Sequence, residues 1–345
     1  MLHRDRLYLL ILMLSLGLVT VAAAQNPSAP PRSDRANLPA QPPGQPSDTV
    51  QVSSQPQQQS MEPDENGTFT FKKRVEEVVL HATVVDQDQH LVTGLQQNDF
   101  VVFEDGRPMP ITSFHREDVP VAIGIVIDNS GSMRDKRQKV NEAAVNLVRA
   151  SNPQDELFVV NFSDEYYLDQ DFTSDIHLLK EGLDHIEARG TTALYDAMVA
   201  SARHLARSAR LDKKILLVVT DGADNASRQS IDECVRNLQA LNGPIVYSIG
   251  ILGDSRDAPR AQHALAALSF QTGGVAFFPR DLSQVGDITR QVAHDIRSQY
   301  TIGYKPTDPN RAGYRSVRVE ARAPGYKRLV VRTRTGYYAG QASTN

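Results

Sequence analysis

The sequence predicts an α/β protein in which a doubly wound, mostly parallel sheet is inserted between two β-strand segments that pair into a small β-sandwich. In the middle of the chain, residues 119–299, apolar runs of strand length alternate with segments of helical apolar spacing, the pattern of a parallel sheet covered on both faces. On either side, in 68–118 and 300–340, apolar residues alternate with a period of two, as in half-buried strands. A length of 345 residues with 40% hydrophobic residues suits about two domains.

The first 67 residues are predicted to lie outside the folded part. Residues 1–24 combine a basic start, an apolar run and three alanines, the pattern of a secretory signal peptide cleaved after Ala24. An uncleaved membrane anchor is the alternative. Residues 25–67 hold nine of the 19 prolines and little apolar surface, which predicts a disordered linker. We therefore expect an exported protein, periplasmic or secreted, with no membrane span after cleavage.

The N-terminal segment 68–118 contains three predicted strands, at 75–85, 100–103 and 111–114. The last two are joined through Asp105-Gly106, a hairpin signal, so Glu104 and Asp105 are interpreted as turn residues rather than catalytic carboxylates.

The middle segment begins with the apolar run 121–127, typical of a buried parallel strand, and a helix follows in which apolar residues recur between 140 and 148. The same alternation predicts strands at 157–162, 215–219, 245–249 and 275–278, and helices at 176–186, 194–206, 231–241, 258–268 and 285–296.

The C-terminal segment 300–340 returns to strand patterning, most clearly at 316–322 and 328–332. Neither flank has enough strands to form a stable domain alone. Pairing 300–340 with 68–118 in one sandwich resolves this, and it makes the middle segment an insertion.

Composition excludes several classes of function. The net charge is −4 and the pI is about 6.1, whereas nucleic-acid-binding domains are normally basic, so no nucleic-acid partner is expected. Cys234 is the single cysteine, which excludes an intramolecular disulfide, a cysteine-based zinc site and a Cys-x-x-Cys redox motif.

Five oxygen-bearing residues are predicted to gather at one edge of the sheet. Asp128, Ser130 and Ser132 follow the first apolar strand, Asp221 follows a later one, and a loop with Thr191 and Thr192 opens a helix between them. Ligands of open α/β sheets bind at the carboxyl edge of the strands. A set of carboxylates and hydroxyls without His or Cys suits a hard divalent cation, with Mg²⁺ favoured and Mn²⁺ or Ca²⁺ as alternatives.

The arrangement Asp128-x-Ser130-x-Ser132, followed by Thr192 and then Asp221, resembles the metal-ion-dependent adhesion site of von Willebrand factor type A (VWA) domains. The resemblance implies that the two serines bind the metal directly, the threonine directly or through water, and the aspartates mostly through water. Residues 92–106 and the tail around 300–304 and 336–338 resemble exported bacterial "VWFA-related" proteins. One departure stands out, because Thr191 occupies a position where the family usually has glycine, and it could add a hydroxyl or stiffen the loop.

The resemblance implies a non-catalytic binding or adhesion protein that captures an Asp or Glu carboxylate of a protein partner. Ser130 lacks the G-x-S-x-G context of a hydrolase nucleophile, and no His is placed as its partner. We therefore predict neither catalytic residues nor an organic cofactor. Three alternatives stay open: an exported hydrolase that uses the metal as a Lewis acid, a VWA domain with a degenerate, purely structural site, and serines that serve only as helix caps.

Overall fold

The structure is a computed structural model that describes residues 77–116, 118–184, 188–240 and 242–340. These residues all belong to one unit, residues 72–345. The predicted signal peptide (1–24) and linker (25–67) lie outside the described residues.

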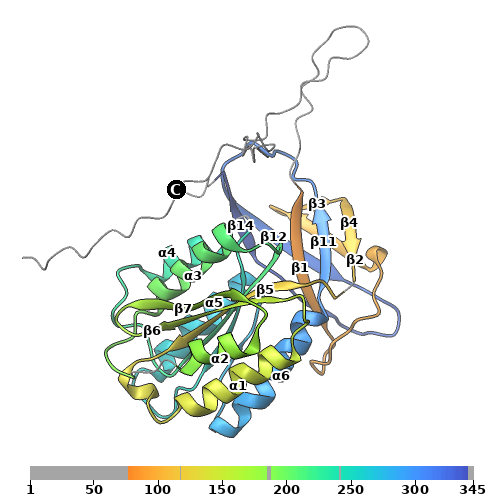
Figure 1. Cartoon of the computed structure of the whole chain (residues 1–345). Coiled ribbons are helices and arrows are strands. Elements are labelled where there is room, and N and C mark those ends of the chain that lie inside the picture. Colours follow the sequence, from red (N-terminus) through yellow and green to blue (C-terminus); the bar gives the residue numbers. More distant parts are fainter. Residues whose placement is uncertain (1–76, 117, 185–187, 241, 341–345) are drawn as a thin grey trace, which may run out of the picture. The chain divides into compact units, whose positions relative to one another are not determined.

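The central sheet has six strands in the order β10-β9-β8-β5-β6-β7. Figure 1 labels β5, β6 and β7 of this sheet, with α1 and α2 on one side of it and α3 on the other. Five of them run parallel, and β7 pairs with β6 in the antiparallel direction. Every residue of β5 is buried, because the strand lies at the centre of the sheet with helices over both faces. The strands are β5 (Val121–Asp128), β6 (Glu156–Phe162), β7 (Tyr166–Thr173), β8 (Lys213–Thr220), β9 (Ile245–Gly250) and β10 (Ala276–Phe277).

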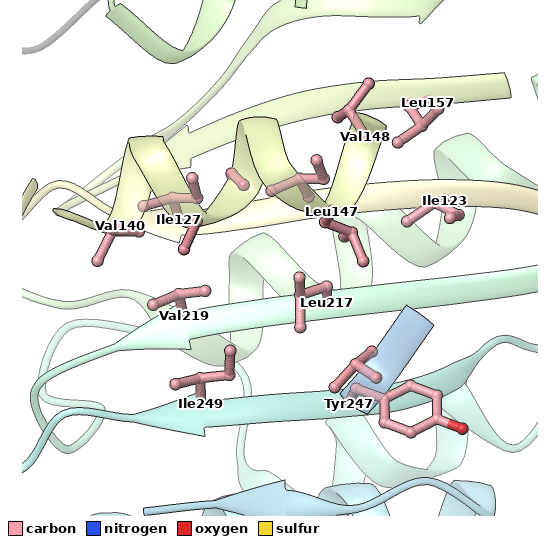
Figure 2. Close-up of a cluster of buried hydrophobic side chains, with 14 of the residues drawn as sticks. Ile123, Ile127, Val140, Leu147, Val148, Leu157, Leu217, Val219, Tyr247 and Ile249 are labelled. Atoms are coloured by element: carbon pink, nitrogen blue, oxygen red, sulfur yellow. The ribbon is translucent and has the colours of Figure 1, made fainter. Parts of the chain in front are cut away.

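Two separate hydrophobic cores hold the helices to the sheet. One side packs against α1 (Arg137–Ala150), α2 (Ile176–Asp184) and α6 (Val285–Arg297). Figure 2 shows part of this core, in which Val140 and Leu147 of α1 lie over side chains of β5 and β8. The other side packs against α3 (Leu194–Ser208), α4 (Ile231–Leu238) and α5 (Ala258–Thr272).

The flanking segments form two four-stranded antiparallel sheets, ordered β13-β1-β11-β4 and β14-β12-β2-β3. Each sheet contains strands from both ends of the chain, since β1 pairs with β11 and β13, and β2 pairs with β12. Their inner faces share one hydrophobic core. The strands are β1 (Val78–Val85), β2 (Phe100–Glu104), β3 (Arg107–Met109), β4 (Ile111–His115), β11 (Tyr300–Tyr304), β12 (Gly313–Ala321), β13 (Val330–Arg332) and β14 (Gly336–Ala339).

The predicted fold class is thereby confirmed: a mostly parallel α/β domain is flanked by antiparallel strands. Several details differ from the sequence prediction. The Asp105-Gly106 turn joins β2 to β3, a strand that was not predicted, whereas β4 pairs with β11 in the other sheet. Strands β11 and β14 were also not predicted. Strand β7 was not predicted, because its polar residues, such as Asp169 and Asp171, break the apolar alternation. Glu104 is not a turn residue but the last residue of β2, where it is 6% exposed. In the described part of the chain, no helix has both the length and the apolarity that crossing a bilayer requires.

Candidate metal centre

Four of the five predicted ligands lie where β5 and β8 end. Asp128 is the last residue of β5, and Ser130 and Ser132 follow it at the short 3₁₀ helix η2 (Gly131–Met133). Asp221 comes directly after β8. Because β5 and β8 are adjacent and parallel, with Ile127 opposite Val219, their carboxyl ends meet at the same edge of the sheet.

The hydroxyl and carboxylate groups of these residues are in contact. The Oγ atoms of Ser130 and Ser132 are 3.2 Å apart, and Ser132 Oγ donates to Asp221 Oδ1 over 2.7 Å. Asp128 accepts from the backbone N–H of Ser130 at 2.8 Å and from Thr220 Oγ1 at 2.6 Å. The structure therefore joins Asp128, Ser130, Ser132 and Asp221 in one hydrogen-bonded cluster.

The hydroxyl of Ser130 does not serve as a helix cap. Ser130 is the N-cap residue of η2, yet its side chain makes no capping hydrogen bond. By contrast, Ser230 at the start of α4 accepts from the backbone N–H of Glu233 in a capping box. The hydroxyl of Ser130 instead contacts Ser132, which contradicts the interpretation of this serine as a simple cap.

Thr192 reaches the same edge from the loop before α3. Its backbone N–H donates to Asn225 Oδ1 at 2.8 Å, and its carbonyl accepts from Asn225 N at 3.0 Å. Its Oγ1 lies 3.8 Å from the position that a Cβ on Gly222 would take, beside Asp221. Within the described residues, however, this hydroxyl forms no hydrogen bond with either serine. Thr191 is exposed on the loop.

A glycine fixes the position of the threonine loop. Gly190 has φ +79°, and a Cβ there would lie 2.1 Å from Asp164 Oδ1. Its carbonyl accepts from the backbone N–H of Gly131 over 3.4 Å. The loop therefore contacts the serine-bearing turn through its backbone, with a close approach and a left-handed conformation that favour glycine.

The cluster places two carboxylates in a buried position. Asp128 is 0% exposed and Asp221 5% exposed. Burial raises the pKa of Asp128, and the charge of Asp221 adds to this rise, while hydrogen bonds from Thr220 and Ser130 oppose it. A bound cation would favour the ionised form.

Two residues of the cluster were missed by the sequence analysis. Thr220 holds Asp128, and its place directly before Asp221 was the available signal. Lys136 contacts Asp221 Oδ2 through its ammonium group, and four residues after Ser132 it starts the helix that follows the motif. The sequence alone does not show which carboxylate a long, flexible lysine side chain will contact.

A second group of potential metal ligands lies in the sandwich, in the turn after β1. One ligand atom from each of Asp86, Asp88 and His90 falls within 4.8 Å of the others. Asp86 Oδ1 already accepts from the backbone N–H groups of Asp88 and His90 at 2.8 and 2.9 Å, so these contacts stabilise the turn itself. The sequence analysis did not predict this group, although the Asp-x-Asp-x-His spacing was visible.

The family model of the von Willebrand factor type A domain matches residues 123–223, a range that includes all five predicted ligands. Together with the doubly wound sheet, this match shows that the chain contains a VWA domain. No curated protein matches the chain.

Several solved structures are similar in fold. The PilB minor pilin from Streptococcus sanguinis has 15% identity and a TM-score of 0.43, over 56% of this chain and 64% of the pilin. A von Willebrand factor type A protein from Catenulispora acidiphila has 14% identity and a TM-score of 0.43, over 78% of this chain and 74% of that one. Proximal thread matrix protein 1 from the mussel byssus, with a zinc-occupied MIDAS motif, has 17% identity and a TM-score of 0.46, over 56% of this chain and 50% of that one. The chain thus spans half to two thirds of the pilin and the byssus protein.

Proposed function

We propose that this chain is an exported, non-catalytic binding or adhesion protein whose VWA domain holds a divalent cation and captures an Asp or Glu carboxylate of a protein partner. The residues proposed to hold the cation are Asp128, Ser130, Ser132, Thr192 and Asp221. The observation that carries the proposal is the direct contact of Ser130 with Ser132 and of Ser132 with Asp221.

The donor set supports a hard cation. It consists of carboxylate and hydroxyl oxygens, which suit Mg²⁺ first and Mn²⁺ or Ca²⁺ as alternatives. The burial of two carboxylates side by side also supports it, because a divalent cation would offset the cost of keeping both ionised. Thr192 is included because its hydroxyl lies beside Gly222, the residue that follows Asp221.

The charge balance supports capture of a carboxylate. Serine and threonine hydroxyls are neutral, so two aspartates at most cancel the charge of the ion. A cation held in this way keeps its attraction for an anionic oxygen, and an acidic side chain of a partner supplies one.

A binding role is preferred to hydrolysis because of what the hydroxyls contact. The hydroxyl of Ser130 is hydrogen-bonded to the hydroxyl of Ser132. Ser132 donates to the carboxylate of Asp221, which also pairs with Lys136. Ser132 is within hydrogen-bond reach of a carboxylate, but Lys136 holds that carboxylate, and within the described residues neither hydroxyl contacts a histidine that could act as a general base.

Export is proposed from the signal-peptide pattern of residues 1–24, which predicts a mature chain beginning at Gln25 in the periplasm or outside the cell. N-terminal sequencing of the protein recovered from the cell envelope or medium tests this. A retained Met1 would contradict cleavage.

The metal site is tested by isothermal titration of the full chain with Mn²⁺ and Mg²⁺, comparing wild type with Ser130→Ala. We expect saturable binding by wild type and its loss in the variant. Ser230→Ala is the matched control, because it removes a serine N-cap outside the site and should leave metal binding unchanged. Equal binding by wild type and Ser130→Ala would contradict the proposal.

The partner is tested by pull-down from envelope extract with and without EDTA. We expect captured protein that is lost with EDTA and also with Ser130→Ala. Capture that is indifferent to both would place the binding surface elsewhere on the chain.

A further inference from the structure

Lys136 places a positive charge at the candidate metal centre. Its Nζ contacts Asp221 Oδ2, while Ser132 donates to the other oxygen of the same carboxylate. The Asp221 side chain is 1% exposed and the Lys136 side chain 29% exposed. The lysine therefore reaches from the surface into a buried anionic cluster, and it is not counted among the proposed metal ligands.

The neighbouring cations have different roles. Arg134 donates to the carbonyl of Ala188 at the surface. Arg137 is buried and donates through Nη2 to Asn161 Oδ1 at 2.9 Å and to the Leu183 carbonyl at 3.2 Å. Within the described residues, no other Lys or Arg forms an ion pair with Asp128 or Asp221.

Arg137 nevertheless balances part of the negative charge. Burial lowers the pKa of Arg137 to about 10, and the nearby charge of Asp128 opposes this lowering. Arg137 therefore acts on Asp128 through its charge, without an ion pair, whereas Lys136 forms an ion pair with Asp221. Because Arg137 also interacts with the charges of Asp169 and Asp184, Lys136 is the cation that directly compensates the proposed metal ligands.

A divalent ion would add two positive charges to a cluster that Lys136 contacts and that lies near Arg137. Like charges a few ångströms apart repel strongly where water is scarce, so one resident cation must leave. Arg137 is fixed by its buried hydrogen bonds. Lys136 has a flexible four-carbon stem and partial exposure, so it can swing its ammonium into solvent.

We propose that the ammonium group of Lys136 neutralises Asp221 as long as no metal ion is bound. This group must move away from Asp221 when a metal ion binds. It stabilises the metal-free cluster, lowers the affinity for divalent cations, and so sets the metal concentration at which the site becomes able to capture a carboxylate. This inference rests on the proposed metal site.

The test compares wild type, Lys136→Met and Lys139→Met by isothermal titration of the full chain with Mg²⁺ and Mn²⁺. Methionine keeps an unbranched apolar stem and removes the charge. Lys139 is the matched control, because it lies on the same helix in an exposed pair with Glu142. We expect Lys136→Met to bind both ions about tenfold more tightly than wild type, Lys136→Arg to stay close to wild type, and Lys139→Met to change affinity less than about twofold.

Thermal unfolding in EDTA separates this role from a merely structural one. Lys136→Met should unfold at a lower temperature than wild type without metal, since Asp221 loses its partner, and saturating Mn²⁺ should recover the difference. If Lys136 only supported the fold, Lys136→Met would lower the stability and the metal affinity together.

The outcomes distinguish the two proposals. If wild type binds metal and Lys136→Met binds it equally or more weakly, this inference is wrong and the metal site stands. If Lys136→Met binds and wild type does not, the inference is supported and the native chain does not function through a resident metal. If neither binds, both proposals fail.

Discussion

Ser132 donates its hydroxyl hydrogen to Asp221 Oδ1 over 2.7 Å, although 89 residues separate the two in the chain. The contact forms because β5 and β8 are neighbours in the sheet and end at the same edge. Two turns that are unrelated in sequence thereby share one cluster of oxygens. A substitution at either residue tests whether this contact serves metal binding or only joins the two turns.

Ser132→Ala should abolish measurable Mn²⁺ binding in isothermal titration, because it removes a proposed direct ligand. In EDTA the free energy of unfolding, measured with urea, should fall by only about 1 kcal/mol, the usual worth of one hydrogen bond. Ser227→Ala is the control, since Ser227 donates to Asp224 in a second Ser–Asp pair that is not among the proposed ligands. Equal metal affinity in the two variants would indicate that the Ser132 contact is structural.

Thr192→Val should weaken Mn²⁺ binding less than Ser132→Ala does, by about tenfold or less. In the described structure the Thr192 hydroxyl is beside Gly222 and outside the hydrogen-bonded cluster, while the loop is held by its backbone contacts with Asn225. Valine keeps the shape and removes the hydroxyl, so the loop should stay in place. Complete loss of binding, with an unchanged unfolding transition, would show that the threonine is an obligatory ligand.

The parts of the site that could be predicted from the sequence are those fixed by local pattern and sheet geometry. Asp128 ends the apolar run of β5, and Asp221 directly follows β8, so their meeting at one edge needs only the parallel arrangement of these two strands. Lys136 could not be assigned in this way. Its backbone position was clear, but the carboxylate that its side chain reaches depends on the packing of α1 against the sheet.

The fold was predictable to a similar extent. The buried runs of β5 and β8 are unambiguous, whereas β7 is an edge strand whose exposed Tyr166, Tyr167 and Leu168 and several acids give no clean period. Glu104 was wrongly assigned to a turn for a different reason. A carboxylate beside a turn normally faces solvent, and the groups that bury it come from residues about 200 positions away.

Glu104→Gln should destabilise the sandwich strongly. Glu104 Oε2 accepts from the hydroxyls of Tyr304 at 2.7 Å and Tyr337 at 2.8 Å, and Oε1 lies 3.4 Å from Nη1 of Arg315, a side chain that is 1% exposed. Removing one charge of a buried pair typically costs about 3–5 kcal/mol, because the other charge stays buried without compensation.

The control for that variant is Glu320→Gln, which breaks surface ion pairs with Arg318 and Arg322 on the same sandwich. It should cost less than about 1 kcal/mol in urea unfolding. A similar small cost for both variants would mean that the Glu104–Arg315 pair is not a stabilising link between the N- and C-terminal strands.

His81 should make the stability of the protein sensitive to acid. Burial lowers the pKa of His81 to about 3, and the charges of Lys213 and Arg334 add to this lowering. The neutral ring is 3.2 Å from Thr301 Oγ1 on the neighbouring strand β11. In the unfolded chain the ring should titrate near its ordinary pKa of about 6.5.

Between these two pKa values the unfolded chain binds a proton that the native chain does not bind, so the free energy of unfolding falls as the pH drops from about 6.5 towards 3. Above pH 6.5 both states are neutral, and His81 contributes no pH dependence. At pH 5 the expected loss from this residue is about 2 kcal/mol.

Urea unfolding at pH 7.5 and pH 5.0 should therefore show a smaller acid loss for His81→Gln than for wild type. His263→Gln, at an exposed position on α5, should retain the full loss. An unchanged pH dependence in His81→Gln would show that the ring is already protonated in the native state or that other groups set the acid sensitivity.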